Sequence, residues 1–315
     1  QAEGQIFYSS TDNQFKTAIA SSAWHSGGPL GSARYGLGGA GSQTAGLAFG
    51  GATSPPFGTK TDTEEYNGIG WGTGGSLGTA RYFIGGCGTQ TAGLAFGGNS
   101  GTRKNETEEY NGSTWSEQNN LSTARRSLGS AGTQTAAAAF GGDTNGSGVT
   151  PVVATEEYDG TSWTNGGDLN TARGGGSNGG PIGSQTATLY AGGFSPPSNT
   201  RVSTNEEYNG SSWASATSLP AVRSNSAVAG TQTNGLLFGG ALPSATNTSF
   251  AYDGTSWTAT PSLASVASLH AGAGTASAAL SFGGYPASGD SATEEFNITV
   301  NTITAGAWSS GGNLN

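Results

Sequence analysis

The chain has little of what builds a helical or strongly charged protein. Only 33% of its 315 residues are hydrophobic and 10% are charged, whereas 57 are glycine. A single large helical core is therefore not expected, and the composition favours thin sheets whose strands are separated by glycine turns. Glycine and proline together stay below the roughly 25–30% that marks disordered low-complexity chains, so we expect a folded protein.

Cysteine, methionine and long apolar runs are also scarce or missing. The single cysteine, Cys87, excludes a disulfide framework, and its place in a strand that carries alanine in sister copies predicts a small buried residue. The sequence has no run of about 18 apolar residues, the length needed to span a membrane, and its first residues have no apolar signal-peptide core. The absence of methionine indicates a sequence that begins after processing or is a fragment.

Positive charge is the scarcer sign. Lys and Arg number 11 against 20 Asp and Glu, which gives a net charge of −9. This balance predicts that neither nucleic acid nor an anionic membrane is a partner. Half of the acidic residues lie in five Glu-Glu pairs, so the excess belongs to a repeated element and not to an acidic tail.

A repeat of about 47 residues organises the chain. Seven tryptophans mark it at intervals of 44 to 51 residues: Trp24, Trp71, Trp115, Trp163, Trp213, Trp257 and Trp308. We interpret each full interval as four strands: one after "TAR", one ending in "LAFGG", one with "EEY" and one with Trp, or a variant of each. Asn-Gly or Asp-Gly before the last strand is a strong hairpin signal, because a type I′ turn needs positive φ at both central residues. A period of this length without helical spacing is typical of propeller blades.

These features resemble the kelch repeat, in which a double glycine follows a hydrophobic strand and a tyrosine and a tryptophan come next. The resemblance covers roughly residues 26–308 and implies an all-β, kelch-like β-propeller of four-stranded blades. The motif "TARYxxxGxxGTQTAGLAFGG" further resembles kelch-like arrays in virion proteins of tailed bacteriophages. The segment "GQIFYSSTDNQFK" resembles a hairpin of phage tail and fibre proteins. Kelch propellers include enzymes, adaptors and lectins, so the fold alone does not choose a function.

A pattern of arginine and glutamate favours six blades, with seven as the alternative. A glutamate lies 17 residues before four of the arginines, as Glu64 does before Arg81. We predict an ion-pair ladder from the third strand of one blade to the start of the next. Arg34 and the pair Glu294 and Glu295 are then left over, and a six-blade ring makes them neighbours. The other interpretation of these arginines is a channel mouth that binds anions.

The repeat also predicts the domain organisation. Residues 1–24 form an N-terminal hairpin and closing strand, 25–308 form the propeller, and 309–315 form a C-terminal extension. The repeated tryptophans are predicted to be structural and to pack between adjacent sheets beside the repeated tyrosines. They are Trp71, Trp115, Trp163, Trp213 and Trp257.

No residue pattern supports catalysis, a cofactor or a metal. His25 and His270 stand at unrelated places in the repeat, whereas a kelch-type copper oxidase needs two histidines beside a Tyr-Cys pair. We therefore predict that the chain is not an enzyme and has no cofactor. Minor alternatives are glycosidase acids among scattered carboxylates such as Asp62, Asp143 and Asp290, and a weak calcium site at 141–148.

The stretches between the double glycine and the "EEY" strand vary in length and content, while the other connections barely change. All must emerge on one face, which is the predicted binding face. Its candidate residues are the aromatic Phe57, Phe194 and Tyr285 and the clustered bases Arg103 and Lys104. Aromatic rings among polar residues suit sugar binding, and contact with another copy of the chain is the alternative.

We therefore expect a non-enzymatic structural or binding propeller of a phage particle, either a tail-fibre or receptor-binding module or a decoration protein. Its expected place is the virion, and its partners are other virion proteins, copies of itself or cell-surface glycans. A secreted or cell-surface glycan-binding propeller, located outside the cell, is the alternative, and a kelch-type oxidase is the third hypothesis.

Overall fold

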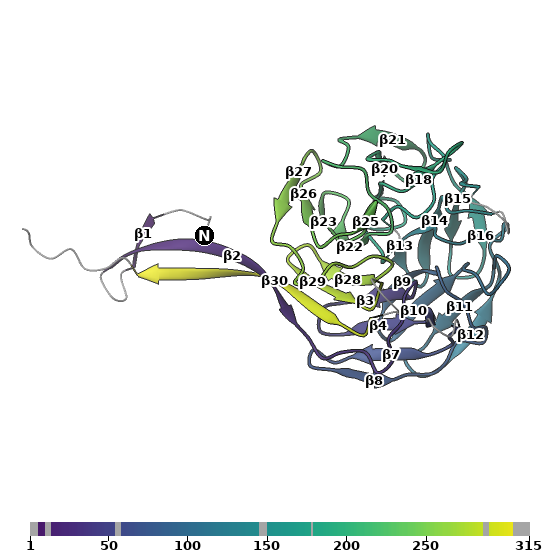
Figure 1. Cartoon of the computed structure of the whole chain (residues 1–315), viewed down its shortest axis with the longest axis horizontal. Helices are drawn as coiled ribbons and strands as arrows, with labels where there is room; N and C mark the ends of the chain where they lie inside the picture. The colour runs from purple at the N-terminus through teal and green to yellow at the C-terminus, as the bar shows by residue number, and fades with distance from the viewer. Residues whose placement is uncertain are drawn as a thin grey trace, which may run out of the picture.

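The computed structural model describes residues 6–9, 14–53, 58–144, 150–177, 179–285 and 290–304. Within these ranges the chain is all-β and has no helix. Six antiparallel sheets stand around one axis and form the disc seen in Figure 1. The structure thus confirms the predicted β-propeller and the count of six blades.

Blades 1 to 3 each contain four strands in chain order from the axis to the rim. Blade 1 consists of β3 (Gly38–Gly41), β4 (Gly46–Phe49), β7 (Thr63–Tyr66) and β8 (Trp71–Thr73). Blade 2 consists of β9 (Gly85–Thr89), β10 (Ala92–Phe96), β11 (Thr107–Tyr110) and β12 (Trp115–Gln118). Blade 3 consists of β13 (Gly129–Thr133), β14 (Ala136–Phe140), β15 (Thr155–Tyr158) and β16 (Trp163–Asn165).

Blades 4 and 5 repeat this order with one exception. Blade 5 has β22 (Ala227–Thr231), β23 (Asn234–Phe238), β26 (Ser249–Tyr252) and β27 (Trp257–Thr260). Blade 4 has only β17 (Thr188–Ala191), β20 (Asn205–Tyr208) and β21 (Trp213–Ala216) among its described residues. Three loops carry short hairpins: β5 (Ala52–Thr53) with β6 (Gly58–Thr59), β18 (Phe194–Ser195) with β19 (Thr200–Arg201), and β24 (Ala241–Leu242) with β25 (Ser244–Ala245).

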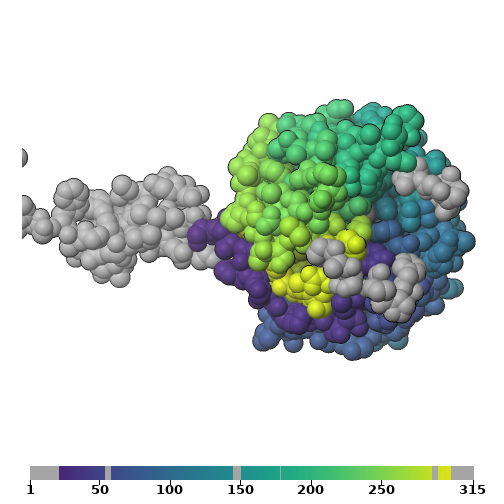
Figure 2. Space-filling model, in the orientation of Figure 1, coloured from purple at the N-terminus to yellow at the C-terminus, as the bar shows by residue number. Residues whose placement is uncertain are grey.

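Blade 6 closes the ring with strands from both ends of the chain. It consists of β28 (Ala271–Thr275), β29 (Ala278–Phe282), β30 (Thr293–Thr304) and the N-terminal β2 (Gln14–Ser26), and β1 (Ile6–Ser9) pairs with β2. Trp24 lies opposite Phe296, so the strand around Trp24 joins the last blade as its outermost strand. Trp308 and the predicted extension 309–315 lie outside the described residues. Figure 2 shows the last blade against the first, which leaves no gap in the ring.

The strands β2 and β30 continue beyond the disc as a paired ribbon. Their register runs from Ser26 opposite Glu294 to Lys16 opposite Thr304, and Figure 1 shows the ribbon extending away from the blades. In contrast, β29 pairs with β30 only between Thr293 and Asn297. The ribbon is therefore attached to the propeller through blade 6 alone.

Small residues bring the inner strands together at the axis. A Cβ on Gly39 would lie 2.8 Å from the carbonyl oxygen of Gly272, which belongs to the neighbouring blade. In blade 4 the irregular segment around Gly179 replaces the inner strand, and the Gly179 amide donates to the Ser226 carbonyl at 3.1 Å. Backbone from several blades thus packs around the axis.

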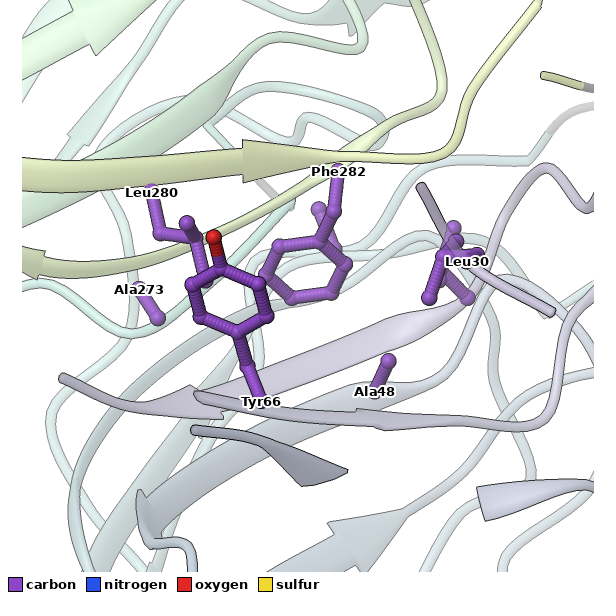
Figure 3. Close-up of a cluster of buried hydrophobic side chains, with 8 residues drawn as sticks. Leu30, Ala48, Tyr66, Ala273, Leu280 and Phe282 are labelled. Atoms are coloured by element: carbon purple, nitrogen blue, oxygen red, sulfur yellow. The ribbon is translucent and has the colours of Figure 1, made fainter. Parts of the chain in front are cut away.

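Aromatic and aliphatic side chains fill the spaces between adjacent blades. Figure 3 shows Tyr66 of blade 1 facing Leu280 and Phe282 of blade 6. Trp71 lies on the same cluster, with its ring centroid 4.9 Å from that of Phe282. The same arrangement recurs around the ring, for example where Trp163 contacts Phe96 at 4.9 Å. Tryptophans in the outer strands therefore bridge neighbouring sheets.

Candidate binding face

The antiparallel connections divide the turns between two faces of the disc. The "GTQT" and Asn-Gly turns lie on one face, which we call the turn face. The variable loops and the "TAR" segments lie on the other, which we call the loop face. This placement follows from strand order, because successive antiparallel strands end on alternate faces.

The repeated glutamines of the turn face make hydrogen bonds between adjacent blades. Each donates from Nε2 to two main-chain carbonyls of the preceding blade, as Gln90 does to Gly46 at 3.0 Å and Tyr66 at 2.7 Å. The same pattern holds for Gln43, Gln134, Gln185 and Gln232. This role was not predicted, although the repeated "TQT" carried the signal. These side chains are structural and are not open to a ligand.

The repeated tyrosines and tryptophans also bond to the preceding blade. The Tyr110 hydroxyl donates to Glu65 at 2.6 Å, and Trp115 Nε1 donates to Thr63 at 2.9 Å. Burial raises the pKa of Tyr66 to about 12, and its hydrogen bond to Glu295 adds to the shift. Equivalent tyrosine bonds are made by Tyr158, Tyr208 and Tyr252. The predicted structural tryptophans pack beside these tyrosines: Trp71, Trp115, Trp163, Trp213 and Trp257.

The predicted register of the arginine ladder is wrong. Arg34 binds Glu64 of its own blade, with Nη2 2.7 Å from Oε1, and does not pair with Glu294 or Glu295. The repeated arginines lie in the segments that lead into the blades, and four of the five bind a glutamate on the third strand of the same blade. The other pairs are Arg81 with Glu108, Arg125 with Glu156 and Arg173 with Glu206, at 2.9–3.0 Å. Burial lowers the pKa of Arg34, and the charge of Glu64 opposes the shift.

Two copies break the ladder in opposite ways. Arg223 faces Phe250, where the other copies have glutamate, and its guanidinium lies 5.0 Å from the ring centroid. It also donates to Thr248, and burial lowers its pKa to about 10. In the last copy Ala267 stands where the others have arginine, and Glu294 accepts the main-chain amide of Ala264 at 2.8 Å. Glu295 accepts the hydroxyl of Tyr66, so the Glu-Glu pair serves two different contacts.

A closed circle of backbone hydrogen bonds surrounds the axis on the loop face. Six residues, one before each blade, have φ between 54° and 62°, and four of them are not glycine. Each amide donates to the carbonyl of the residue before it in the circle, at 2.6–3.1 Å. The residues are Gly36, Phe83, Ser127, Gly175, Asn225 and Leu269. Holding non-glycine residues at positive φ is costly, so the circle fixes their side chains around the axis.

Aromatic side chains gather beside this circle. Tyr35 contacts Tyr82 and Tyr285 edge to face, at centroid distances of 6.3 and 6.1 Å. Burial raises the pKa of Tyr35. Tyr285 is 42% exposed, so a large part of its ring faces solvent. Tyr285 was predicted for this face. Tyr35 and Tyr82 were not, and each directly follows a repeated arginine.

Two hollows on the loop face meet at Asn225. The larger, of about 470 Å³, is lined by residues from blades 4, 5 and 6, including Arg201, Asn225, Ser268 and Tyr285. The smaller, of about 120 Å³, is lined by residues that include Arg126, Asp143 and Phe194. Asn225 makes no side-chain hydrogen bond within the described residues, so its amide is available to a ligand.

The predicted basic cluster is not an open positive patch. The Arg103 side chain is only 6% exposed and binds Asp143, with Nη2 2.6 Å from Oδ1. Lys104 pairs with Glu106 at 3.2 Å. Phe194 is half-buried under Arg201, whose guanidinium lies 5.1 Å from its ring centroid. Phe57 lies outside the described residues.

The acidic, histidine and cysteine side chains of the described residues lie apart from one another or are held in ion pairs and hydrogen bonds. They contain no cluster of three or more His, Cys, Asp and Glu side chains that could hold a metal ion. Cys87 is buried, and burial raises the pKa of its thiol. Asp143 is held by two arginines, and Asp290 accepts the amide of Ala292 at 2.9 Å. Much of the predicted calcium segment 141–148 lies outside the described ranges.

No helix in the part of the chain that the structure describes is long and apolar enough to cross a membrane. The chain matches no known protein-family model, and it matches no curated protein.

Proposed function

We propose that this chain is a non-catalytic binding propeller whose loop face holds a saccharide. One contrast carries the proposal. The repeated polar side chains of the blades are occupied by bonds within the ring, whereas non-repeated groups on the loop face surround open hollows. Tyr285 offers an exposed ring and Asn225 an unbonded amide, and aromatic faces with amide groups are typical of sugar-binding sites.

The setting that we propose is the particle of a tailed phage, as a tail-fibre, receptor-binding or decoration protein. The resemblance of the repeat wording to phage arrays supports this setting. A secreted or cell-surface propeller with the same ligand class is the alternative. Mass spectrometry separates the two hypotheses. A phage-particle protein should be found in purified particles, and a secreted propeller in the host secretome.

A glycan array tests the binding function directly. Tyr285→Ala removes the exposed ring, and Asn225→Gly removes the amide while keeping a residue that tolerates φ of 54°. Both variants should lose most of the glycan signal. Ile69→Ala, at an exposed side chain on the turn face, is the matched control and should bind like the parent chain. Signal that is absent for every glycan, or equal in all four proteins, would refute the proposal.

A structural role in an assembly is the second candidate function. The ribbon of β2 and β30 supports it, because β29 covers β30 only as far as Asn297 while the pairing with β2 runs to Thr304. Narrow ribbons are marginally stable alone and gain stability by packing or pairing with further strands. Light scattering at rising concentration tests this role, and a monomer at all concentrations would count against self-association.

A further inference from the structure

On the loop face, two arginines hold the side-chain carboxylate of Asp143 in blade 3. Asp143 directly follows a double glycine and lies between two arginines from different blades. Arg103 binds Oδ1 through Nε and Nη2, at 2.9 and 2.6 Å, and Arg126 binds Oδ2 through Nε at 2.9 Å. The carboxylate is almost fully buried, so these charge-assisted bonds replace its contact with water.

The same backbone arrangement recurs two blades further on without the carboxylate. Ser224 exchanges backbone bonds with Ala241, as Arg126 does with Asp143. Arg201 pairs with the post-glycine residue Phe194 of its own blade, as Arg103 pairs with Asn99. The positions of Arg103, Asp143 and Arg126 are thus occupied by Arg201, Ala241 and Ser224. A methyl group stands where the equivalent site has a carboxylate.

Arg201 consequently has no acidic partner among the described residues. Its Nε donates to the Ser224 hydroxyl at 3.0 Å, and its guanidinium stacks on Phe194. It lines the 470 Å³ hollow together with Ala241, and none of the described residues that line this hollow is acidic. In a chain with a net charge of −9, a half-buried arginine without a carboxylate marks a place for a negative ligand.

The rest of the hollow favours a sugar over a peptide as the carrier of that charge. The exposed ring of Tyr285 offers a stacking surface, and Asn225 and Ser268 offer polar groups suited to hydroxyls. The hollow is wide enough for about one or two sugar rings by the usual size of ligand pockets. Arg201 and Ala241 both line it.

We propose that this hollow binds the carboxylate of an acidic saccharide, such as a uronic or sialic acid unit, with Arg201 in the role that Arg103 plays toward Asp143. The proposal rests on the saccharide-binding function proposed above and specifies its ligand class. The ligand carboxylate would lie over Ala241, the sugar ring would contact Tyr285, and Asn225 would bond to hydroxyl groups.

A ligand-free test examines the equivalence of the two sites. Ala241→Asp restores the missing carboxylate, which should pair with Arg201. We expect Ala241→Asp to lower the melting temperature by about 2–4 °C more in an Arg201→Gln background than in the parent chain. Equal effects in the two backgrounds would show that Arg201 does not reach a carboxylate at position 241, and would overturn the proposal.

Glycan binding provides the second test. The probes are oligosaccharides that end in glucuronic or sialic acid, the same oligosaccharides with the carboxyl group reduced to an alcohol, sulfated oligosaccharides and a poly-glutamate peptide. We expect binding of the acidic glycans only, and at least about tenfold weaker binding after carboxyl reduction or Arg201→Gln. Ala241→Asp should block binding equally, because it fills the arginine's place. Lys60→Gln removes one positive charge from the loop following β6 and should bind like the parent chain.

The outcomes separate this inference from the proposed function. Equal binding of reduced and acidic glycans, unchanged by Arg201→Gln, would refute the carboxylate site and leave a neutral saccharide as the ligand. Preference for sulfated glycans or for the peptide would refute the ligand class named here. Absence of binding to every probe would refute both proposals.

Discussion

Replacement of His270 should change how the stability of the propeller depends on pH. It occupies the position that Leu37, Ile84 and Leu128 occupy in other blades, at the start of an inner strand. Its side chain is 1% exposed, and neither ring nitrogen has a hydrogen-bond partner within the described residues. Burial lowers the pKa of His270 to about 3. The Phe238 main chain opposes this shift only in part, because its contact with the ring falls short of hydrogen-bond geometry.

The size and sign of the effect follow from this pKa. An unfolded histidine has a pKa near 6.5, so as the pH falls below about 6.5 the unfolded chain gains a proton that folded His270 refuses. Stability is then lost at about 1.4 kcal/mol per pH unit until the pH nears 3, which amounts to about 3 kcal/mol at pH 4.5. At neutral pH the cost is instead that of two buried polar atoms, on the order of 1–3 kcal/mol.

His270→Leu should therefore stabilise the chain at pH 7.5 and stabilise it further at pH 4.5. Denaturant unfolding at both pH values measures the free energies, and the loss between them should be about 3 kcal/mol smaller in the variant than in the parent chain. His25→Gln, at an exposed side chain, controls for the loss of a histidine. An equal loss of stability in the parent chain and in His270→Leu would refute the buried neutral histidine.

Three further experiments test the bonds within and between blades. Glu206→Ala leaves the charge of Arg173 buried without its partner and should cost about 3–5 kcal/mol in denaturant unfolding, and a cost below about 1 kcal/mol would contradict the pairing. Ala251→Glu with Phe296→Tyr installs the tyrosine-glutamate bond that blades 5 and 6 lack, and a double-mutant cycle should give a coupling of about 1 kcal/mol, with zero coupling as the contrary result. Trp163→Ala should cost about 3–5 kcal/mol, because the ring packs between two sheets, and an almost unchanged midpoint would show that it does not.

The blades could be predicted from sequence because their signals are local. Asn-Gly and Asp-Gly lie between paired strands, as in the pairing of Tyr110 with Trp115 around Asn111 and Gly112. The predicted turn type is wrong, because only the glycine has positive φ and the connection spans residues 111–114. The double glycines have positive φ, as at Gly50 and Gly51. A substituent on Gly50 would meet the segment that leads into the next blade, and one on Gly51 would meet the segment that leads into its own blade. Such short-range demands recur in every copy, so the repeat itself reveals them.

Blade 4 shows where a local departure from the repeat matters. Its segment "SNGGPIG" lacks a regular inner strand, and Pro181 has no amide to donate to a ladder. Instead, the amides around it bond to blades 3 and 5, as Ile182 does to Ser130 at 3.3 Å. The glycines and the proline of this segment argue against a strand at the sequence level. Its hydrogen-bond partners in blades 3 and 5 come close only when the ring is closed.

The candidate site was harder to predict because it is made of residues that do not repeat. Arg103 was expected to be an open base, yet Asp143 of the next blade neutralises it. Arg201 and Asn225 carried no sequence signal, because their proximity arises only when loops from blades 4 and 5 fold over the same face. A binding face built from unique residues on a repeated scaffold is hidden from any method that reads the repeat alone.

The error in the arginine ladder has a more general cause. Glu64 lies 30 residues after Arg34 and 17 before Arg81, and these two intervals add up to one period of 47. In a ring of similar blades, either neighbour gives a complete ladder, so spacing alone cannot choose between them. Phe250 and Ala267 stand 17 residues apart in place of a glutamate and an arginine, which fits the 17-residue pairing equally well. In the structure these are two separate breaks, because Arg223 stacks on Phe250 and Glu294 accepts the amide of Ala264. A repeated pair in a propeller is therefore assigned securely only when a broken copy exposes its true partner, and the stacking of Arg223 on Phe250 is that evidence here.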